Sequence, residues 1–137
     1  MFMIISEMDQ NTNGAKSKKR IREICIPDSG TTHTILRQKR YFSDIKPTRI
    51  VVNTISGPAD VIEGTGKANF TLPNGTKFSI NNALYSPSSK RNLLSFKDIY
   101  LHGYDTQSAT EDVKKYMYVT SEKCGRKHIL EKFPELP

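Results

Sequence analysis

Ile24-Cys25-Ile26-Pro27-Asp28-Ser29-Gly30-Thr31 is the stretch that decides the fold, because a short apolar run leads directly into Asp-Ser-Gly. β-Branched residues favour a strand, which would carry the carboxylate of Asp28 to its end. The hydroxyl of Ser29 can hold the loop by hydrogen bonding. Gly30 has no Cβ, so backbone N–H groups can approach the carboxylate closely. The alternative is an ordinary turn, in which Asp-Ser-Gly is also common.

Three further segments set this triplet in context. All four occur in a fixed order along the chain: Asp28-Ser29-Gly30-Thr31-Thr32-His33, Gly64-Thr65-Gly66, Ala83-Leu84-Tyr85-Ser86-Pro87 and Arg91-Asn92-Leu93-Leu94-Ser95-Phe96. Together they resemble the protease region of the Gag-Pol polyprotein of copia-type retrotransposons, over residues 20 to 132. The segment 123–131 is similar to the one that leads into the pre-integrase region of plant copia elements. Each piece alone is weak, and the ordered set is specific.

The resemblance implies a homodimeric aspartic endopeptidase that cuts Gag-Pol. Asp28 of each subunit would face its twin at about 3 Å, where the two carboxylates share one proton and activate water. Ser29 would brace the two loops, and Gly30 would give backbone access to the carboxylate. Gly64, Thr65 and Gly66 are the candidate for a substrate-binding flap, with a bulge or bend in a strand as the alternative. No cofactor is implied.

The remaining pattern predicts an all-β domain, a small closed β-barrel of the retropepsin-like type. Six or so short strands are separated by turn residues, and Asn74-Gly75 predicts a type I′ hairpin. Leu36 to Phe42 is expected to form a helical turn. One short helix is expected near residues 95–102, with Ser95 as its cap and Asp98 as the acidic partner of a capping box.

Three segments are expected along the chain: a flexible basic leader over 1–20, the barrel over 21–110 and an extension toward the pre-integrase region over 111–137. The chain starts with Met1 and ends at Pro137 without Gag, integrase or reverse transcriptase sequence, so a truncated fragment is expected. Weak, non-specific nucleic-acid binding by the leader is possible, although solvated surface is the commoner role of such charges.

Several other classes of site fit poorly. The three histidines and two cysteines have no zinc-site spacing, so no metal is expected. No Gly-x-Ser-x-Gly elbow supports a Ser-His-Asp triad. No run is long enough to span a membrane and no secretory signal is recognisable, which favours a cytoplasmic or nuclear location. Two function classes remain, the aspartic endopeptidase and a catalytically inactive β-barrel remnant that binds or dimerises.

Overall fold

The computed structural model describes residues 3–6, 22–54 and 57–134, and these form two antiparallel or mixed β-sheets. The all-β prediction is confirmed. The first sheet consists of β1 (Met3–Ser6), β2 (Arg22–Asp28), β3 (Ile35–Leu36), β4 (Phe42–Thr54), β5 (Gly57–Thr71), β6 (Lys77–Tyr85) and β7 (Asn92–Ser95). The second consists of β8 (Asp105–Glu111), β9 (Lys114–Lys123) and β10 (Arg126–Pro134). A 3-10 turn, Lys39–Tyr41, and one helix, α1 (Phe96–Leu101), complete the described elements.

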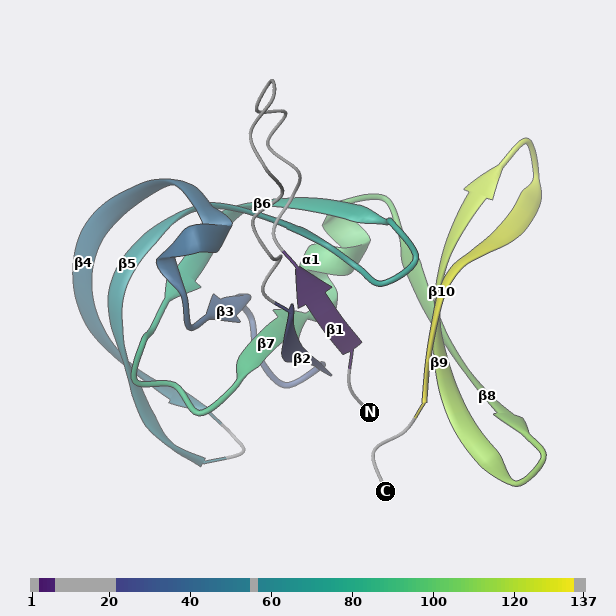
Figure 1. Cartoon of the computed structure of the whole chain (residues 1–137), viewed down its shortest axis with the longest axis horizontal. Helices are drawn as coiled ribbons and strands as arrows, with labels where there is room; N and C mark the ends of the chain where they lie inside the picture. The colour runs from purple at the N-terminus through teal and green to yellow at the C-terminus, as the bar shows by residue number, and fades with distance from the viewer. Residues whose placement is uncertain (1–2, 7–21, 55–56, 135–137) are drawn as a thin grey trace.

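The order of strands in the first sheet is β1-β2-β7-β3-β6-β5-β4. β7 therefore lies between β2 and β3, which are consecutive in the chain. It runs parallel to β2 and antiparallel to β3. A further pairing of Ser6 with Thr71 brings β1 beside β5, and the sheet curls into a barrel-like shape (Figure 1).

The core of this barrel comes from the inward face of each strand. Phe70 and Phe78 stack on each other at 5.6 Å, and Tyr41 packs edge-on against Phe70. Both sheets contribute to the same cluster, because Met117, Val119 and Phe133 join it from β9 and β10. Of the helical turn predicted over Leu36 to Phe42 only Lys39–Tyr41 is helical, and the helix predicted after Ser95 is confirmed. No helix in the described ranges is long and apolar enough to cross a membrane.

Three details differ from the sequence-based expectations. Met3–Ser6 were expected in a flexible leader and instead form β1, paired with β2; the basic run 16–20 lies outside the described residues. The second sheet begins at Asp105, before the expected boundary at 110. The hairpin at Asn74 is present, but Gly75 N–H donates to Leu72 O, so Pro73 and Asn74 are its central residues. Pro73 fixes a negative φ, which excludes the type I′ turn.

The second sheet lies at one side of the barrel and contacts the β5–β6 turn (Figure 1). Glu131 of β10 is buried at 2% exposure, and its carboxylate accepts hydrogen bonds from Asn74 N, Thr76 N and Thr76 Oγ1. The Asn74 side-chain amide also donates to Leu130 O. Glu131 is therefore the main polar connection between the two sheets.

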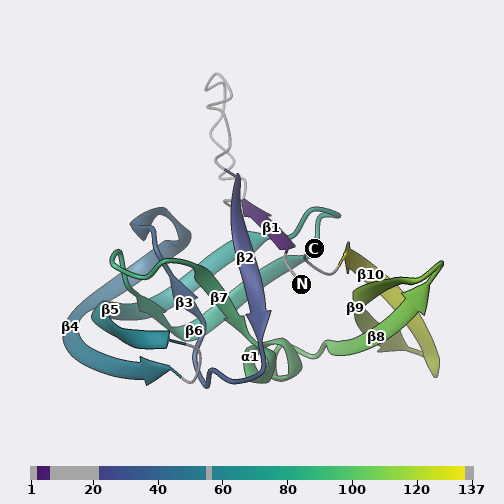
Figure 2. The same ribbon diagram turned by 90° about the horizontal axis from the view of Figure 1, so that it is seen from below.

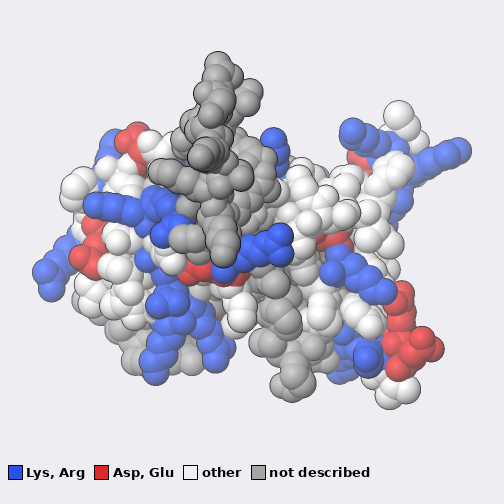
Figure 3. Space-filling view, viewed as in Figure 1, with Lys and Arg blue, Asp and Glu red and all other residues white. Residues whose placement is uncertain are grey.

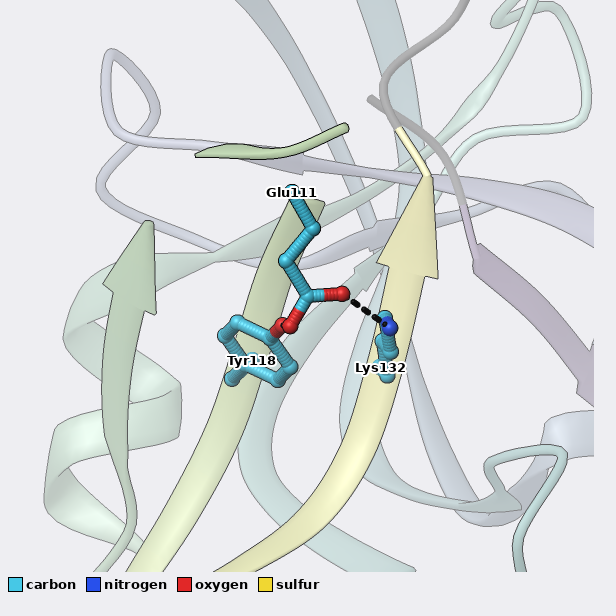
Figure 4. Close-up of polar contacts among 3 residues, drawn as sticks. All are labelled: Glu111, Tyr118 and Lys132. Atoms are coloured by element: carbon cyan, nitrogen blue, oxygen red, sulfur yellow. Dashed lines mark hydrogen bonds and ion pairs between the residues drawn. The ribbon is translucent and has the colours of Figure 1, made fainter. Parts of the chain in front are cut away.

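The outward face of the second sheet carries a three-strand cluster (Figure 4). Glu111 of β8 accepts hydrogen bonds from Tyr118 of β9 at 2.5 Å and from Lys132 of β10 at 2.6 Å. These donors, Lys132 first, hold the pKa of Glu111 below its usual range, and the bond to Glu111 raises the pKa of Lys132. Because the side chains of Glu111 and Lys132 are about half exposed, solvent screens the ion pair, and its contribution to the stability of the fold is small.

Gly66→Ala is expected to destabilise the barrel by about 3 kcal/mol, because an added methyl group would overpack the strand contact. A Cβ at Gly66 would lie 1.7 Å from the carbonyl oxygen of Asp44, so β4 and β5 would have to separate. The measurement is urea unfolding, with Thr65→Ala as the control in the same strand. Equal unfolding midpoints for Gly66→Ala and the wild type would contradict this prediction.

Stability is expected to fall as the pH rises above about 9, because burial favours the neutral forms of two core groups. Burial raises the pKa of the Cys25 thiol from its usual 9.0, and burial together with a hydrogen bond to Glu23 raises that of Tyr41 from 10.0. In the unfolded chain both groups ionise at the usual values, while in the folded chain they stay neutral. Each group therefore costs about 1.4 kcal/mol per pH unit above its unfolded pKa.

The check is urea unfolding of the wild type and of Cys25→Ala with Tyr41→Phe between about pH 8 and 11, the range that spans both unfolded pKa values. The double variant starts from a lower stability and is expected to lose less of it across this range. Parallel declines in the two proteins would show that other groups cause the alkaline loss.

Candidate functional site

Asp28 is the last residue of β2, at one end of the barrel. Its backbone is paired with Ser95, the last residue of β7, in the parallel register of these strands. Residues 29–34 must then pass across the end of β7 to reach β3, because β7 lies between β2 and β3. Figure 2 shows β2 running down to this loop, with α1 beside it. The order of strands thus places Asp28 at the barrel end, where β2 passes into the loop 29–34.

The carboxylate of Asp28 is held from one side and open on the other. Gly30 N–H donates to Asp28 Oδ1 at 2.7 Å, as the sequence led us to expect of a residue without a Cβ. Asp28 is partly exposed, and both Ser29 and Gly30 are exposed. Within the described residues no other group donates to this carboxylate or forms an ion pair with it. Asp28 is therefore free to meet a second carboxyl group, a water or a ligand.

The loop is tied to α1 by side chains that the sequence analysis assigned to another role. Ser95 makes no side-chain cap, so the predicted capping box is wrong. Its hydroxyl donates instead to Thr31 O at 2.9 Å. Asp98 Oδ2 accepts from Thr34 N at 3.1 Å and from Thr34 Oγ1 at 2.7 Å. The partners lie more than sixty residues away, which is why local sequence could not reveal them.

Asn92 connects the strands on either side of β7 at its other end. Its amide donates to Ile24 O of β2 at 3.0 Å and accepts from Arg37 N, just after β3, at 2.8 Å. The side chain is 1% exposed, so it replaces backbone hydrogen bonds in a dry environment. Asn92 belongs to the segment Arg91-Asn92-Leu93-Leu94-Ser95-Phe96, for which the sequence predicted no role of this residue. The signal that could have indicated this role is a polar residue directly before the apolar pair Leu93-Leu94.

His33 lies in the same loop and makes local contacts. Its Nδ1 is 3.0 Å from Thr32 Oγ1, and its carbonyl oxygen accepts from Thr31 Oγ1 at 2.9 Å. These contacts shape the loop and leave the ring exposed. In the ranges that the structure describes, no group of three His, Cys, Asp or Glu side chains could hold a metal ion.

Gly64, Thr65 and Gly66 lie inside β5, where both β4 and β6 pair with them. They are not at the end of a hairpin, and a register shift follows between Gly66 and Ala68. This register shift marks a bulge or irregularity directly after the triplet, and a bulge or bend in a strand was the alternative to the flap. Beyond Gly64, residues 57–62 of β5 pair only with β4, so the two strands continue as a two-stranded ribbon. The role of the triplet in closing over a substrate stays a prediction.

Positive charge is spread over the face of the molecule that Figure 3 shows. The chain has a net charge of +7, and Figure 3 shows Lys and Arg in several separate groups over the barrel and the second sheet. On the face that Figure 3 shows, such a distribution is typical of solvated charge.

Comparison with known families connects this site to a known kind of domain. Residues 25–104 match a family described as "Pol polyprotein, beta-barrel domain". The match runs from Cys25, within β2, to Tyr104 after α1, and so includes Asp28, its loop and the residues that hold it. Comparison with curated proteins and with solved structures gives no match.

Proposed function

Since this chain belongs to the Pol polyprotein beta-barrel domain family, a region of retrotransposon Pol polyproteins, we propose that it is an aspartic endopeptidase of copia type. It would act as a homodimer on Gag-Pol. The copia assignment is supported by the ordered motifs: two of them lie on strands that pair with β3, and the first leads into it. Leu84 N–H donates to Thr34 O and Ser86 N–H donates to Leu36 O, while Leu93 of β7 pairs with Ile35.

One observation carries the proposal: a single open carboxylate, that of Asp28, on a loop held from inside the domain. An aspartic protease needs two carboxylates that share a proton, and this motif occurs once per chain. A second copy is the simplest source of the other carboxylate. The exposure of Ser29 and Gly30 beside Asp28 leaves room for such a partner.

In the dimer, the two Asp28 carboxylates would lie about 3 Å apart, too close for both to carry a charge. The ionised one accepts a proton from a bound water as the water attacks the scissile carbonyl carbon. The protonated one donates a hydrogen bond to the carbonyl oxygen and stabilises its developing negative charge. The proton then moves to the leaving nitrogen, and the C–N bond breaks without a covalent intermediate.

A closing element is needed to exclude water from this reaction. The two-stranded ribbon at the end of β4 and β5 is the best candidate, because the neighbouring strand β6 pairs with β5 only from Gly64 onward. Gly64 and Gly66 then lie at the base of this ribbon. Their close approach to Ile45 and to Asp44 would fix where the ribbon leaves the sheet.

The test is cleavage of a copia-type Gag–Pol junction fragment by the purified chain at about pH 5.5, over a range of protein concentrations. At low concentration the rate is expected to rise with the square of the chain concentration, because only the dimer is active. No cleavage by chain that is folded by circular dichroism would contradict the proposal. That result would favour the alternative, an inactive β-barrel remnant that binds or dimerises.

A further inference from the structure

The loop that carries Asp28 is joined to the start of α1 by four hydrogen bonds. Thr34 donates twice to Asp98 Oδ2, Ser95 N–H donates to Thr34 Oγ1 at 3.2 Å, and Ser95 Oγ donates to Thr31 O. Thr34 and Ser95 are both fully buried. None of these bonds belongs to the strand ladders or to the helix itself. Because the Ser95 hydroxyl is engaged in them, α1 has no side-chain cap, and what these bonds hold in place is the loop.

We propose that Asp98 is a positioning residue for Asp28, an inference that rests on the proposed protease function. A single oxygen atom of Asp98, Oδ2, accepts hydrogen bonds from both the N–H and the hydroxyl of Thr34. This fixes the φ and χ1 angles of the residue at which the loop ends and β3 begins. Asp98 need not touch substrate to have this effect.

The places at which the loop is anchored explain how Asp98 influences the position of Asp28. The loop is anchored at Asp28 by the pairing with Ser95, in its middle at Thr31 O, and at its end at Thr34. Gly30, whose N–H holds Asp28 Oδ1, lies between the first two anchors. Thr34 Oγ1 is also the acceptor for Ser95 N–H, so loss of Asp98 frees the Thr34 hydroxyl and loosens this second contact as well.

The experiment compares Asp98→Ala with Asp98→Asn and with Asp105→Ala. Asn keeps one oxygen in place of Oδ2 and can accept both bonds from Thr34, so it is the conservative rescue. Asp105 is exposed at the start of β8 and its side chain makes no contact among those described, so Asp105→Ala removes the same charge without the bonds. Two quantities are measured for each protein: kcat and KM for junction cleavage, and hydrogen exchange at the Gly30 amide.

Asp98→Ala is expected to lower kcat by about 10- to 100-fold with little change in KM, because it misplaces the catalytic group by a fraction of an ångström. It is also expected to speed exchange at Gly30. Asp98→Asn should restore both values to within about threefold of the wild type, since it keeps the acceptor oxygen. Asp105→Ala should match the wild type. If Asp98→Ala does not fold, Thr34→Val takes its place, because it replaces the hydroxyl by a methyl group and so removes the bonds of that hydroxyl to Asp98 and Ser95.

Unchanged exchange at Gly30 in a folded Asp98→Ala or Thr34→Val protein would overturn the inference. So would a loss of kcat that Asp98→Asn fails to rescue. Hydrogen exchange needs no catalysis, so the role of Asp98 is decided even if the wild type proves unable to cleave. In that event the protease proposal fails while the positioning of the Asp28 loop stands or falls by exchange alone.

Discussion

Asp28→Asn is expected to lower kcat by at least about 10³-fold, the size of effect that loss of a general acid–base group produces. An amide cannot accept the proton of the attacking water, so neither subunit could activate it. The Gly30 N–H can still donate to the remaining oxygen at position 28, so the loop should keep its shape. Relief of the repulsion between two close carboxylates is expected to leave the dimer as tight as before, or tighter.

The measurement is steady-state cleavage of the junction fragment, with sedimentation to establish the dimer. Asp44→Asn is the matched control, because it makes the same chemical change at an exposed aspartate in β4, outside the loop. It should cleave like the wild type. Full activity in Asp28→Asn would exclude Asp28 as the catalytic group.

Glu131→Ala is expected to destabilise the fold by about 3 kcal/mol, since it leaves buried donors without an acceptor. Three donors, from Asn74 and Thr76, lose their partner at once. Glu131 forms no ion pair among the described residues, so hydrogen bonds from these donors must offset the cost of removing its carboxylate from water. Glu131→Gln, which keeps one good acceptor, should fall between alanine and the wild type.

Urea unfolding measures this loss, with Glu122→Ala as the control. Glu122 lies on the neighbouring strand β9 but is exposed and makes no side-chain contact among those described. Its removal should change stability by less than about 0.5 kcal/mol. Equal stabilities of the two alanine variants would mean that the second sheet does not depend on this contact with the β5–β6 turn.

Local patterns predicted the elements of this fold well. Ile24-Cys25-Ile26 forms a strand, Asn74-Gly75 lies at a hairpin, and a short helix follows Ser95, because each depends on residues close in sequence. The predicted type I′ turn was wrong because the backbone angle that Pro73 imposes excludes the turn that Asn74-Gly75 favours. A prolyl φ is fixed by its ring, whereas Asn only tolerates a positive φ.

Long-range features could not be predicted in the same way. Ser95 and Asp98 have the spacing of a capping box, but their side chains bond to Thr31 and Thr34 instead. The choice between the two depends on β7 lying beside β2, which periodicity does not encode. The burial of Glu131 likewise could not be predicted, since a charged residue in an amphipathic strand is usually exposed. The open carboxylate of Asp28 was expected, and what holds its loop in place was not.

The most direct test of the shared site is to mix wild-type chain with increasing amounts of Asp28→Asn at constant total concentration and to measure cleavage. If one site takes one Asp28 from each of two chains, activity should fall as the square of the wild-type fraction. A linear fall would mean that each chain carries a complete site, and absence of cleavage by the wild-type dimer would mean that there is no protease; either result would contradict the account.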